Sequence, residues 1–306
     1  MSEIIKKLKH GADCSALLGC VRYFAEEYPE LEIGYMGTSV LGRGIPMIVL
    51  GGEGCKKSVL YVAAHHASEH ITSAVLLLFV EEYLAALHSR RRVCGICVPR
   101  LFENHRIYVI PQLNPDGVEI AINGCSGSLR ERLISMNGGD DFTHWQANAR
   151  GVDLNHNYDA RFFEYKRLEP SLGVASPGPS RFSGASPESE PESAALASLL
   201  RRRKLSLRGV LTLHSQGEEI YCAPRDFLGH RAECTARLVS SVTGYKRCTP
   251  AGSASYGGLT DWCVSSLRLP SFTIECGLGE NPLPQSDMLP IYERLRELFF
   301  SFPLFA

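Results

Sequence analysis

Short apolar runs alternate with segments of helical periodicity along most of the chain. Runs of β character are expected at 31–40, 45–51, 57–64, 106–113, 208–215 and 270–277. Helical spacing of apolar residues predicts helices at 13–28, 70–88, 226–243 and 258–267, one beginning near Pro191 and a terminal one. Apolar strands that alternate with helices predict an α/β/α sandwich around a central mixed, mostly parallel sheet, buried on both faces.

Polar segments between these elements predict turns and loops. Asn114-Pro115-Asp116-Gly117 is a turn signal. Residues 123–150 and 171–193 are rich in Gly, Ser, Asn or Pro; we expect a surface loop at the first and a long loop on the active side at the second. Since we find neither a repeat nor a convincing linker, residues 1–306 are interpreted as a single catalytic domain.

Composition and charge narrow the class of protein. The chain is 44% apolar and 21% charged, as is usual for a globular protein. A formal net charge of −1 gives no electrostatic reason to expect nucleic acid or an anionic membrane as partner. The basic run 201–204 closes an expected helix, where it suits the helix dipole. No apolar stretch is expected to span a bilayer, since the longest, 75–84, contains two glutamates.

The cysteines bear on the compartment. The chain has 11 of them, an odd count, and its N-terminal residues lack the apolar region of a signal peptide. Most of the cysteines are scattered through apolar runs, so we expect free thiols and a cytoplasmic location. Cys94 and Cys97 form a CxxC pair without a second pair, and their role stays open.

Candidate chemistry follows three of the expected strands. His66 and Glu69 come just after the run 57–64, and His214 and Glu275 end two later runs. Functional groups gather past the carboxyl ends of the strands in such sheets. Two histidines and a glutamate are a common ligand set for catalytic zinc, and a separate glutamate provides the general base. The sequence therefore indicates a site for one zinc ion.

A second interpretation takes residues 66–70 as an H-x-x-E-H motif, in which His66 and His70 both bind the metal and Glu69 is the base. It requires a helix at 66–70, although the β run ends two residues earlier, and it gives His214 and Glu275 no role. A plain surface pair of histidine and carboxylate is a third possibility, although a buried glutamate at the end of an apolar strand needs a partner or a function.

The motifs H-x-x-E, G-V-D-L-N-x-N, H-S after an apolar strand, G-G-x-x-D and F-T-x-E, in this order, resemble those of the zinc carboxypeptidase family, founded on carboxypeptidase A. The segments 42–52 and 111–119 are similar to the family as well. The resemblance implies that His66, Glu69 and His214 hold zinc and that Glu275 is the catalytic carboxylate. It also implies that Asp153 accepts a hydrogen bond from the first histidine.

Other positions depart from the digestive members of the family. Arg150 is our candidate for the donor that stabilises the tetrahedral intermediate, although its spacing differs from that in the founding enzymes. Asn155-His156 stands where those enzymes carry Asn-Arg to hold a terminal carboxylate, and an imidazole does not replace a guanidinium fork. Strong, general recognition of peptide C-termini is therefore not expected.

Two positions of the expected substrate pocket also differ. Ser253 stands in place of the capping tyrosine, for which Tyr256 is a substitute. Thr260, at the position that shapes the side-chain pocket, is neither large and apolar nor charged, so a digestive preference for aromatic or basic residues is not predicted.

Segments such as WQANARGVDLNHNYDA and FTIECGLGENPLP are similar to those of bacterial γ-D-glutamyl-diaminopimelate peptidases and murein-peptide amidases. The resemblance implies a small murein-derived peptide as substrate, held by the polar anchors Arg150, Asn155, His156 and Glu218. A general cytosolic metallocarboxypeptidase that acts on ordinary C-termini is the alternative, and a non-catalytic binding module is the third. The sequence does not indicate an oligomeric state.

Overall fold

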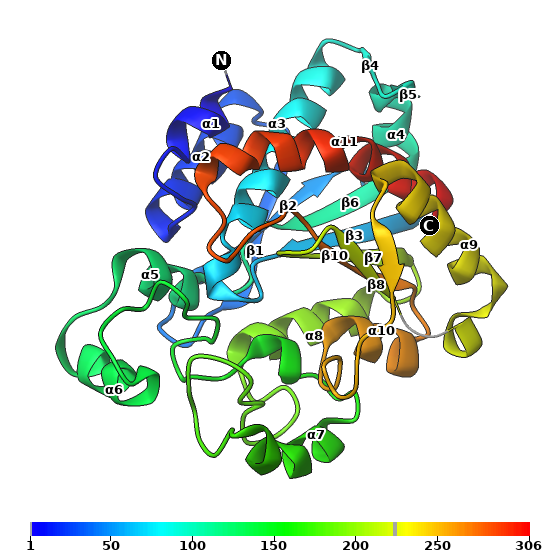
Figure 1. The fold of residues 1–306 in the computed structure, drawn as a ribbon. Helices are drawn as coiled ribbons and strands as arrows, with labels where there is room; N and C mark the ends of the chain where they lie inside the picture. The colour runs from blue at the N-terminus through cyan, green and yellow to red at the C-terminus, as the bar shows by residue number, and fades with distance from the viewer. Residues whose placement is uncertain (1, 223–224) are drawn as a thin grey trace.

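The computed structural model describes residues 2–222 and 225–306 and contains a main sheet of eight strands in the order β1-β2-β6-β3-β7-β10-β8-β9 (Figure 1). The neighbouring strands β6, β3, β7 and β10 at its centre are parallel, whereas β1, β2 and β8 pair antiparallel to their neighbours on the central side. The strands are β1 Glu32–Thr38, β2 Gly44–Leu50, β3 Lys57–Ala63, β6 His105–Ile110, β7 Leu207–His214, β8 Glu219–Cys222, β9 Lys246–Cys248 and β10 Ser271–Glu275. The remaining two, β4 Arg92–Val93 and β5 Ile96–Cys97, form a separate hairpin.

Helices cover both faces of the sheet, so the mixed, mostly parallel α/β/α architecture is as predicted (Figure 1). One face carries α1 Glu3–Lys7, α2 Cys14–Glu27, α3 Ile71–His88, α9 Arg225–Thr243 and α11 Met288–Phe305. The other face carries α8 Pro191–Arg203 and α10 Leu259–Leu267. The remaining helices are α4 Val98–Asn104, α5 Pro115–Asn123, α6 Gly127–Asn137 and α7 Phe162–Leu168. Asp13 caps α2 as expected, since its carboxylate accepts a hydrogen bond from Ala16 N at 2.8 Å.

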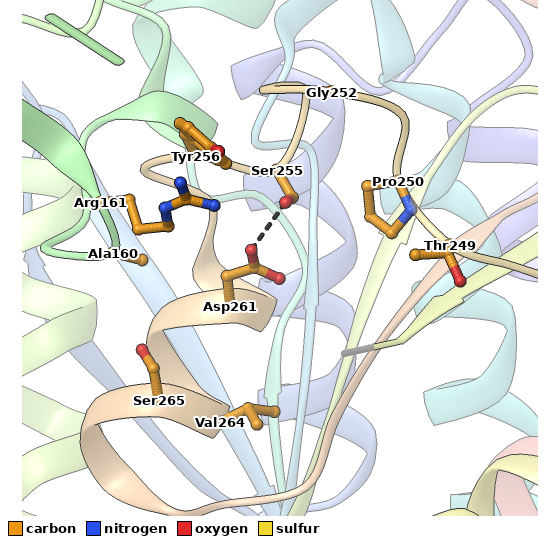
Figure 2. Close-up of a pocket in the computed structure, with 10 residues that line it drawn as sticks. All are labelled: Ala160, Arg161, Thr249, Pro250, Gly252, Ser255, Tyr256, Asp261, Val264 and Ser265. Atoms are coloured by element: carbon orange, nitrogen blue, oxygen red, sulfur yellow. Dashed lines mark hydrogen bonds between the residues drawn. The ribbon is translucent and has the colours of Figure 1, made fainter. Parts of the chain in front are cut away.

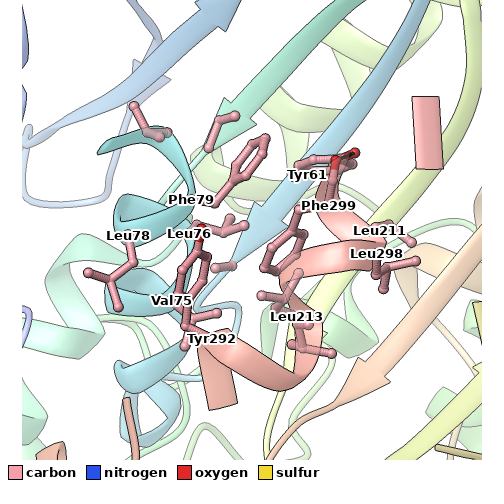
Figure 3. Close-up of a cluster of buried hydrophobic side chains, with 14 of the residues drawn as sticks. Tyr61, Val75, Leu76, Leu78, Phe79, Leu211, Leu213, Tyr292, Leu298 and Phe299 are labelled. Carbon is pink, nitrogen blue, oxygen red and sulfur yellow. Dashed lines mark hydrogen bonds between the residues drawn. The ribbon is translucent and has the colours of Figure 1, made fainter. Parts of the chain in front are cut away.

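The larger core lies between the sheet and the helices α3 and α11 (Figure 3). Phe79 of α3 contacts Tyr61 of β3 and Phe300 of α11, with ring centroids 5.6 and 5.2 Å apart. The Tyr61 hydroxyl donates to the Phe299 carbonyl oxygen at 2.8 Å, so a buried polar group in this cluster is satisfied. The packing fixes α3 against β3, and the connection between these two elements carries His66 and Glu69.

The expectation that no apolar segment has the length to cross a membrane is wrong. The segment Ala67–His88 is long and apolar enough by composition, despite Glu81 and Glu82 within its apolar run. In this fold, 78% of its most apolar window is buried inside the protein. A helix that is apolar on all sides belongs in a core when neighbours cover it, and here α3 is covered by the sheet, α1 and α11.

Two loop predictions are also wrong. Asn114 and Pro115 start the helix α5 instead of forming a turn, with the Asn114 side chain accepting a hydrogen bond from Gly117 N at 3.0 Å. Within 123–150, the helix α6 occupies Gly127–Asn137. Only Leu133 of this helix is buried, so its sequence has almost no apolar face and reads as a polar loop.

The active-side loop predicted at 171–193 ends where α8 begins, at Pro191. Its backbone carbonyls at Pro179 and Phe182 accept hydrogen bonds from Gln146 N at 2.9 Å and Asp153 N at 2.8 Å. This loop therefore braces the segment that leads to Asp153. The single-domain interpretation of 1–306 stays a prediction.

Candidate metal centre and active site

Three neighbouring parallel strands bring the predicted site residues together. β3, β7 and β10 lie side by side, and Glu275 at the end of β10 is in register with His214 at the end of β7. After β3, Ala64 adopts a φ of 52°, and a single 3-10 turn, Ala67–Glu69, follows His66. The ends of parallel strands thus collect side chains that are more than 140 residues apart in the sequence, as the distance from His66 to His214 shows.

His66, Glu69 and His214 form a compact group of potential metal ligands. The Nδ1 atoms of the two histidines are 3.3 Å apart. Glu69 Oε1 lies 2.8 Å from the Nδ1 of His66, and its Oε2 lies 2.9 Å from the Nδ1 of His214. Ligand atoms about 2.0 Å from a tetrahedral zinc ion are about 3.3 Å from one another, which matches the separation of the two imidazole nitrogens.

The hydrogen bonding of the group fits a cation as well. His66 directs its Nε2 at Asp153 Oδ1, 3.2 Å away, so that the Nε2–H donates and Nδ1 keeps a free lone pair. Glu69 Oε2 is buried and has no hydrogen bond, although it lies 2.9 Å from His214 Nδ1. A buried carboxylate oxygen without a donor is costly unless a cation compensates it.

The charges around the group are strongly coupled. Burial opposes ionisation of Glu69, but His66 and His214 outweigh it and lower the pKa of this carboxyl. Burial also opposes ionisation of Asp153, whose pKa is nevertheless lowered by His66 and His156. Glu275 differs, because burial raises its pKa to about 7 against the opposing effect of His214. Glu69 and Asp153 are therefore stabilised as carboxylates beside the imidazoles, whereas the pKa of Glu275 lies close to neutral pH.

An open pocket contains Glu275 together with His66 and Glu69. Its other lining residues are His144, Gln146, Ser215, Gln216, Tyr221, Glu280 and Asn281. Sequence reasoning missed Gln146 as a site residue. Its backbone oxygen accepts a hydrogen bond from Ala67 N at 3.0 Å, which holds it beside the turn that carries Glu69. Gln146 has no charge and belongs to no recognised short motif. The one sequence signal for it is its position four residues before Arg150, a candidate for the same role.

Arg150 does not line this pocket. Its side chain is 51% exposed, and its Nη1 pairs with Glu190 Oε2 at 3.4 Å. Glu190 also accepts a hydrogen bond from Asn148, which anchors the pair in a separate network. The geometry therefore gives Arg150 a contact outside the metal pocket, whereas Gln146 lines that pocket.

His156 is held by its neighbours. Its Nδ1 donates to the Tyr256 carbonyl oxygen at 2.6 Å, and its ring stacks on Tyr165 with centroids 4.1 Å apart. One ring nitrogen is thus already used, which leaves at most one for a substrate. The Tyr256 side chain, a predicted substrate contact, lies over the guanidinium of Arg161 at 3.8 Å and lines a cavity beside the metal pocket.

Asn155 and Thr260 lie together in a narrow space beside the metal pocket. Asn155 Oδ1 accepts a hydrogen bond from Leu259 N at 3.1 Å, and Thr260 Oγ1 is 2.9 Å from Thr273 Oγ1. Both predicted substrate residues therefore come next to the site. Glu218 lines none of these pockets; its backbone oxygen accepts from Lys246 N at 3.2 Å.

His70, the ligand of the rival H-x-x-E-H interpretation, is directed elsewhere. It stands before α3, and its Nδ1 is 3.3 Å from the Gln285 side-chain amide. Residues 67–69 form one 3-10 turn, so the helix that the motif requires across 66–70 is absent from this described segment. The geometry supports His214 as the third ligand instead.

Fold and site together define a metallohydrolase of the α/β type. The profile of the zinc carboxypeptidase family matches residues 18–298, and the chain belongs to this family. It is 33% identical over 292 residues to γ-D-glutamyl-L-diamino acid endopeptidase 1 of Lysinibacillus sphaericus, with 94% of this chain and 71% of the relative covered.

Two solved structures share the fold at 19% identity. Thrombin activatable fibrinolysis inhibitor superposes with a TM-score of 0.75 over 99% of this chain and 79% of its own. Murein-tripeptide amidase MpaA of Escherichia coli O157 superposes with a TM-score of 0.54 over 90% of this chain and 92% of its own. The family assignment makes the chain a hydrolase of peptide or amide bonds that depends on zinc.

Proposed function

We propose that the protein hydrolyses the γ-D-glutamyl–meso-diaminopimelate bond of cell-wall peptides with one zinc ion held by His66, Glu69 and His214. The observation that carries the proposal is the 33% identity over 94% of the chain to a γ-D-glutamyl-L-diamino acid endopeptidase. The geometry of the site supports it, because Glu275 and Gln146 line the same pocket as the ligand candidates His66 and Glu69, and His214 completes the ligand group.

Glu275 and Asp153 have separate roles in the proposed hydrolysis. Bound zinc supplies Lewis acidity, which acidifies a water molecule and polarises a carbonyl group. Glu275 lines the pocket and has no ion-pair partner within 4.0 Å among the described residues, so it is free to accept the proton of the attacking water. It then donates this proton to the departing amine. Asp153 orients His66 throughout by accepting the hydrogen bond from its Nε2.

Gln146 is the donor that we assign to the reacting carbonyl oxygen in place of Arg150. Gln146 lines the metal pocket, and two backbone hydrogen bonds, with Ala67 and Pro179, fix its main chain. A preorganised neutral donor stabilises the developing oxyanion without the charge of a guanidinium. Asn155, His156, Tyr256 and Thr260 form the substrate side of the site.

The arrangement of His156 disfavours the alternative of a general carboxypeptidase. A free C-terminal carboxylate is best held by two parallel N–H donors, as in a guanidinium fork. His156 gives its Nδ1–H to the Tyr256 carbonyl and has only its other nitrogen left. Murein-derived peptides as substrates and a cytoplasmic location stay predictions, as does the oligomeric state.

A pair of isomeric substrates tests the proposal. We expect the zinc-loaded protein to cleave L-Ala-γ-D-Glu-meso-diaminopimelate with a kcat/KM at least about 100-fold above that of the α-linked isomer. Glu275→Gln serves as the inactive control for contaminating peptidases. Equal or better cleavage of the α-linked isomer and of ordinary C-terminal residues would support the general carboxypeptidase and reject the γ-linked specificity.

A further inference from the structure

A cavity of about 220 Å³ lies beside the metal pocket, between α10 and the loop that follows β9 (Figure 2). Asp261 stands in its middle, with Arg161 and Tyr256 on one side and Thr249 and Pro250 on the other (Figure 2). The remaining lining residues are Ala160, Gly252, Ser255, Val264 and Ser265. None of the residues that hold the metal or activate water belongs to this cavity.

A smaller space, which we call the neck, has lining residues in common with both this cavity and the metal pocket. The neck has a volume of about 30 Å³ and contains Asn155, Thr260 and Thr273. It shares Tyr221 with the metal pocket and shares Asp261, Ser255 and Pro250 with the cavity. A space of this volume holds about two water molecules, so it favours a slim, unbranched group over an aromatic ring.

Asp261 offers a negative charge to the cavity. Its Oδ2 accepts a hydrogen bond from the Ser255 hydroxyl at 2.6 Å. In the part of the chain that the structure describes, no lysine, arginine or histidine is within ion-pair distance of this carboxylate. Its half-buried position raises its pKa, against the effects of Ser255 and Arg161. A carboxylate of this kind is stabilised by a cation that enters from the cavity.

Arg161 offers the opposite charge on the same cavity. Its guanidinium lies 3.8 Å from the centroid of the Tyr256 ring, and its Nε donates to Glu164 Oε2 at 2.9 Å. Its Nη2 also contacts Glu164. Since Nη1 has no hydrogen-bond partner among the described residues, this nitrogen is available to an anion while Tyr256 and Glu164 hold the group in place.

We propose that this cavity binds the distal amino-acid group of the diaminopimelate residue on the leaving side of the scissile bond, with its ammonium on Asp261 and its carboxylate on Arg161. The inference rests on the proposed function. Three methylene groups separate the two ends of diaminopimelate, and they occupy the neck beside Thr260. A zwitterion at the end of an unbranched chain matches an anion and a cation that lie beyond a space of small volume.

The series of substrates that tests this assignment varies one side chain. The compounds γ-D-Glu-meso-diaminopimelate, γ-D-Glu-L-lysine and γ-D-Glu-L-norleucine carry both charges, the ammonium alone and neither. We expect kcat/KM to fall along this series by about 10-fold or more at each step, as for the loss of a charge-assisted hydrogen bond.

Two variants assign the charges to residues. Asp261→Asn keeps an amide oxygen for the Ser255 hydrogen bond, and we expect it to reduce the lysine-to-norleucine ratio of kcat/KM from at least about 10 to about 1. Arg161→Gln is expected to do the same to the diaminopimelate-to-lysine ratio. Asp140→Asn, at an aspartate that is outside all three pockets, is the matched control and is expected to leave both ratios unchanged.

The outcomes separate this inference from the proposed function. Efficient cleavage of all three compounds with similar kcat/KM would overturn the assignment of the cavity while the γ-glutamyl specificity stands. Failure to cleave any γ-linked compound would reject the proposed function itself. If Asp261→Asn does not fold, the kcat/KM ratios of Arg161→Gln and of the unaltered protein still test the assignment of the cavity.

Discussion

Replacement of Asp153 by asparagine should weaken zinc binding without removing a ligand. Asp153 Oδ1 lies 3.2 Å from His66 Nε2 and accepts from Asn155 N at 3.0 Å, and Oδ2 accepts from Arg181 N at 3.0 Å. An asparagine oxygen can keep the first two contacts. Its NH2 group then faces the Arg181 N–H, and the negative charge that supports the imidazole is lost.

The substitution affects both zinc affinity and stability, and the contacts of Asp153 give the size of each change. Loss of a carboxylate behind a zinc-bound histidine reduces metal affinity by about 10- to 100-fold, which is about 1.4 to 2.7 kcal/mol. The Arg181 N–H loses its carboxylate acceptor, which lowers the free energy of unfolding by about 0.5 to 1.5 kcal/mol. Because the donors that contact the metal are unchanged, kcat/KM at saturating zinc should fall much less than the affinity.

Competition with a chelating dye measures the zinc affinity, and urea unfolding of the metal-free protein measures stability. Asp140→Asn is the control, since among the described residues this exposed carboxylate pairs with Arg130 alone. A zinc affinity within about 2-fold of the unaltered protein would refute the role of Asp153. Loss of affinity with no change in stability would instead refute the hydrogen-bond assignment to Arg181.

Three further predictions follow from the site and its surroundings. Glu275→Gln should reduce kcat by about 10²- to 10⁴-fold with zinc content unchanged by elemental analysis, and retained activity would remove this carboxylate from the proton transfers. Gln146→Ala should reduce kcat/KM by about 10²-fold or more, whereas Arg150→Ala should leave it within about 3-fold, and the reverse result would return the donor role to Arg150. Burial raises the pKa of Glu192 to about 7, so the folded state keeps a proton that the unfolded chain loses above about pH 4.5, and stability should fall as the pH rises toward 7. Glu192→Gln should flatten this slope in urea titrations and raise stability at pH 8 by up to roughly 3 kcal/mol; an unchanged slope would contradict the assignment.

The strands and the principal helices were predictable because their apolar residues follow the period of the element. β3, β7 and β10 are buried on both faces and read as continuous apolar runs. The short strands β8 and β9 were not predicted, and neither was α6, because a brief or exposed element buries too few side chains to leave a period. Asn114 and Pro115 show a different limit, since the same residues favour turns and helix starts, and only tertiary packing decides.

The metal-ligand candidates were predictable because each stands at the end of a strand, where the topology alone collects side chains. The substrate side was not. Arg150 was chosen as a candidate because of its charge, but it pairs with Glu190 outside the metal pocket. Gln146 lines the pocket because its backbone bonds to Ala67 and Pro179, and no sequence pattern predicts these contacts. The cavity around Asp261 forms where the loop after β9 lies against α10. The periodicity of apolar residues does not predict such a contact between a loop and a helix.

Mass spectrometry of the products formed from L-Ala-γ-D-Glu-meso-diaminopimelate, with and without a chelator, is the decisive measurement of zinc-dependent cleavage at the γ-linked bond. We expect L-Ala-D-Glu and free diaminopimelate from the zinc-loaded protein, no products after chelation, and recovery when zinc is returned. An intact tripeptide in a preparation that trims ordinary peptides, or cleavage that persists in the fully metal-free protein, would contradict this expectation.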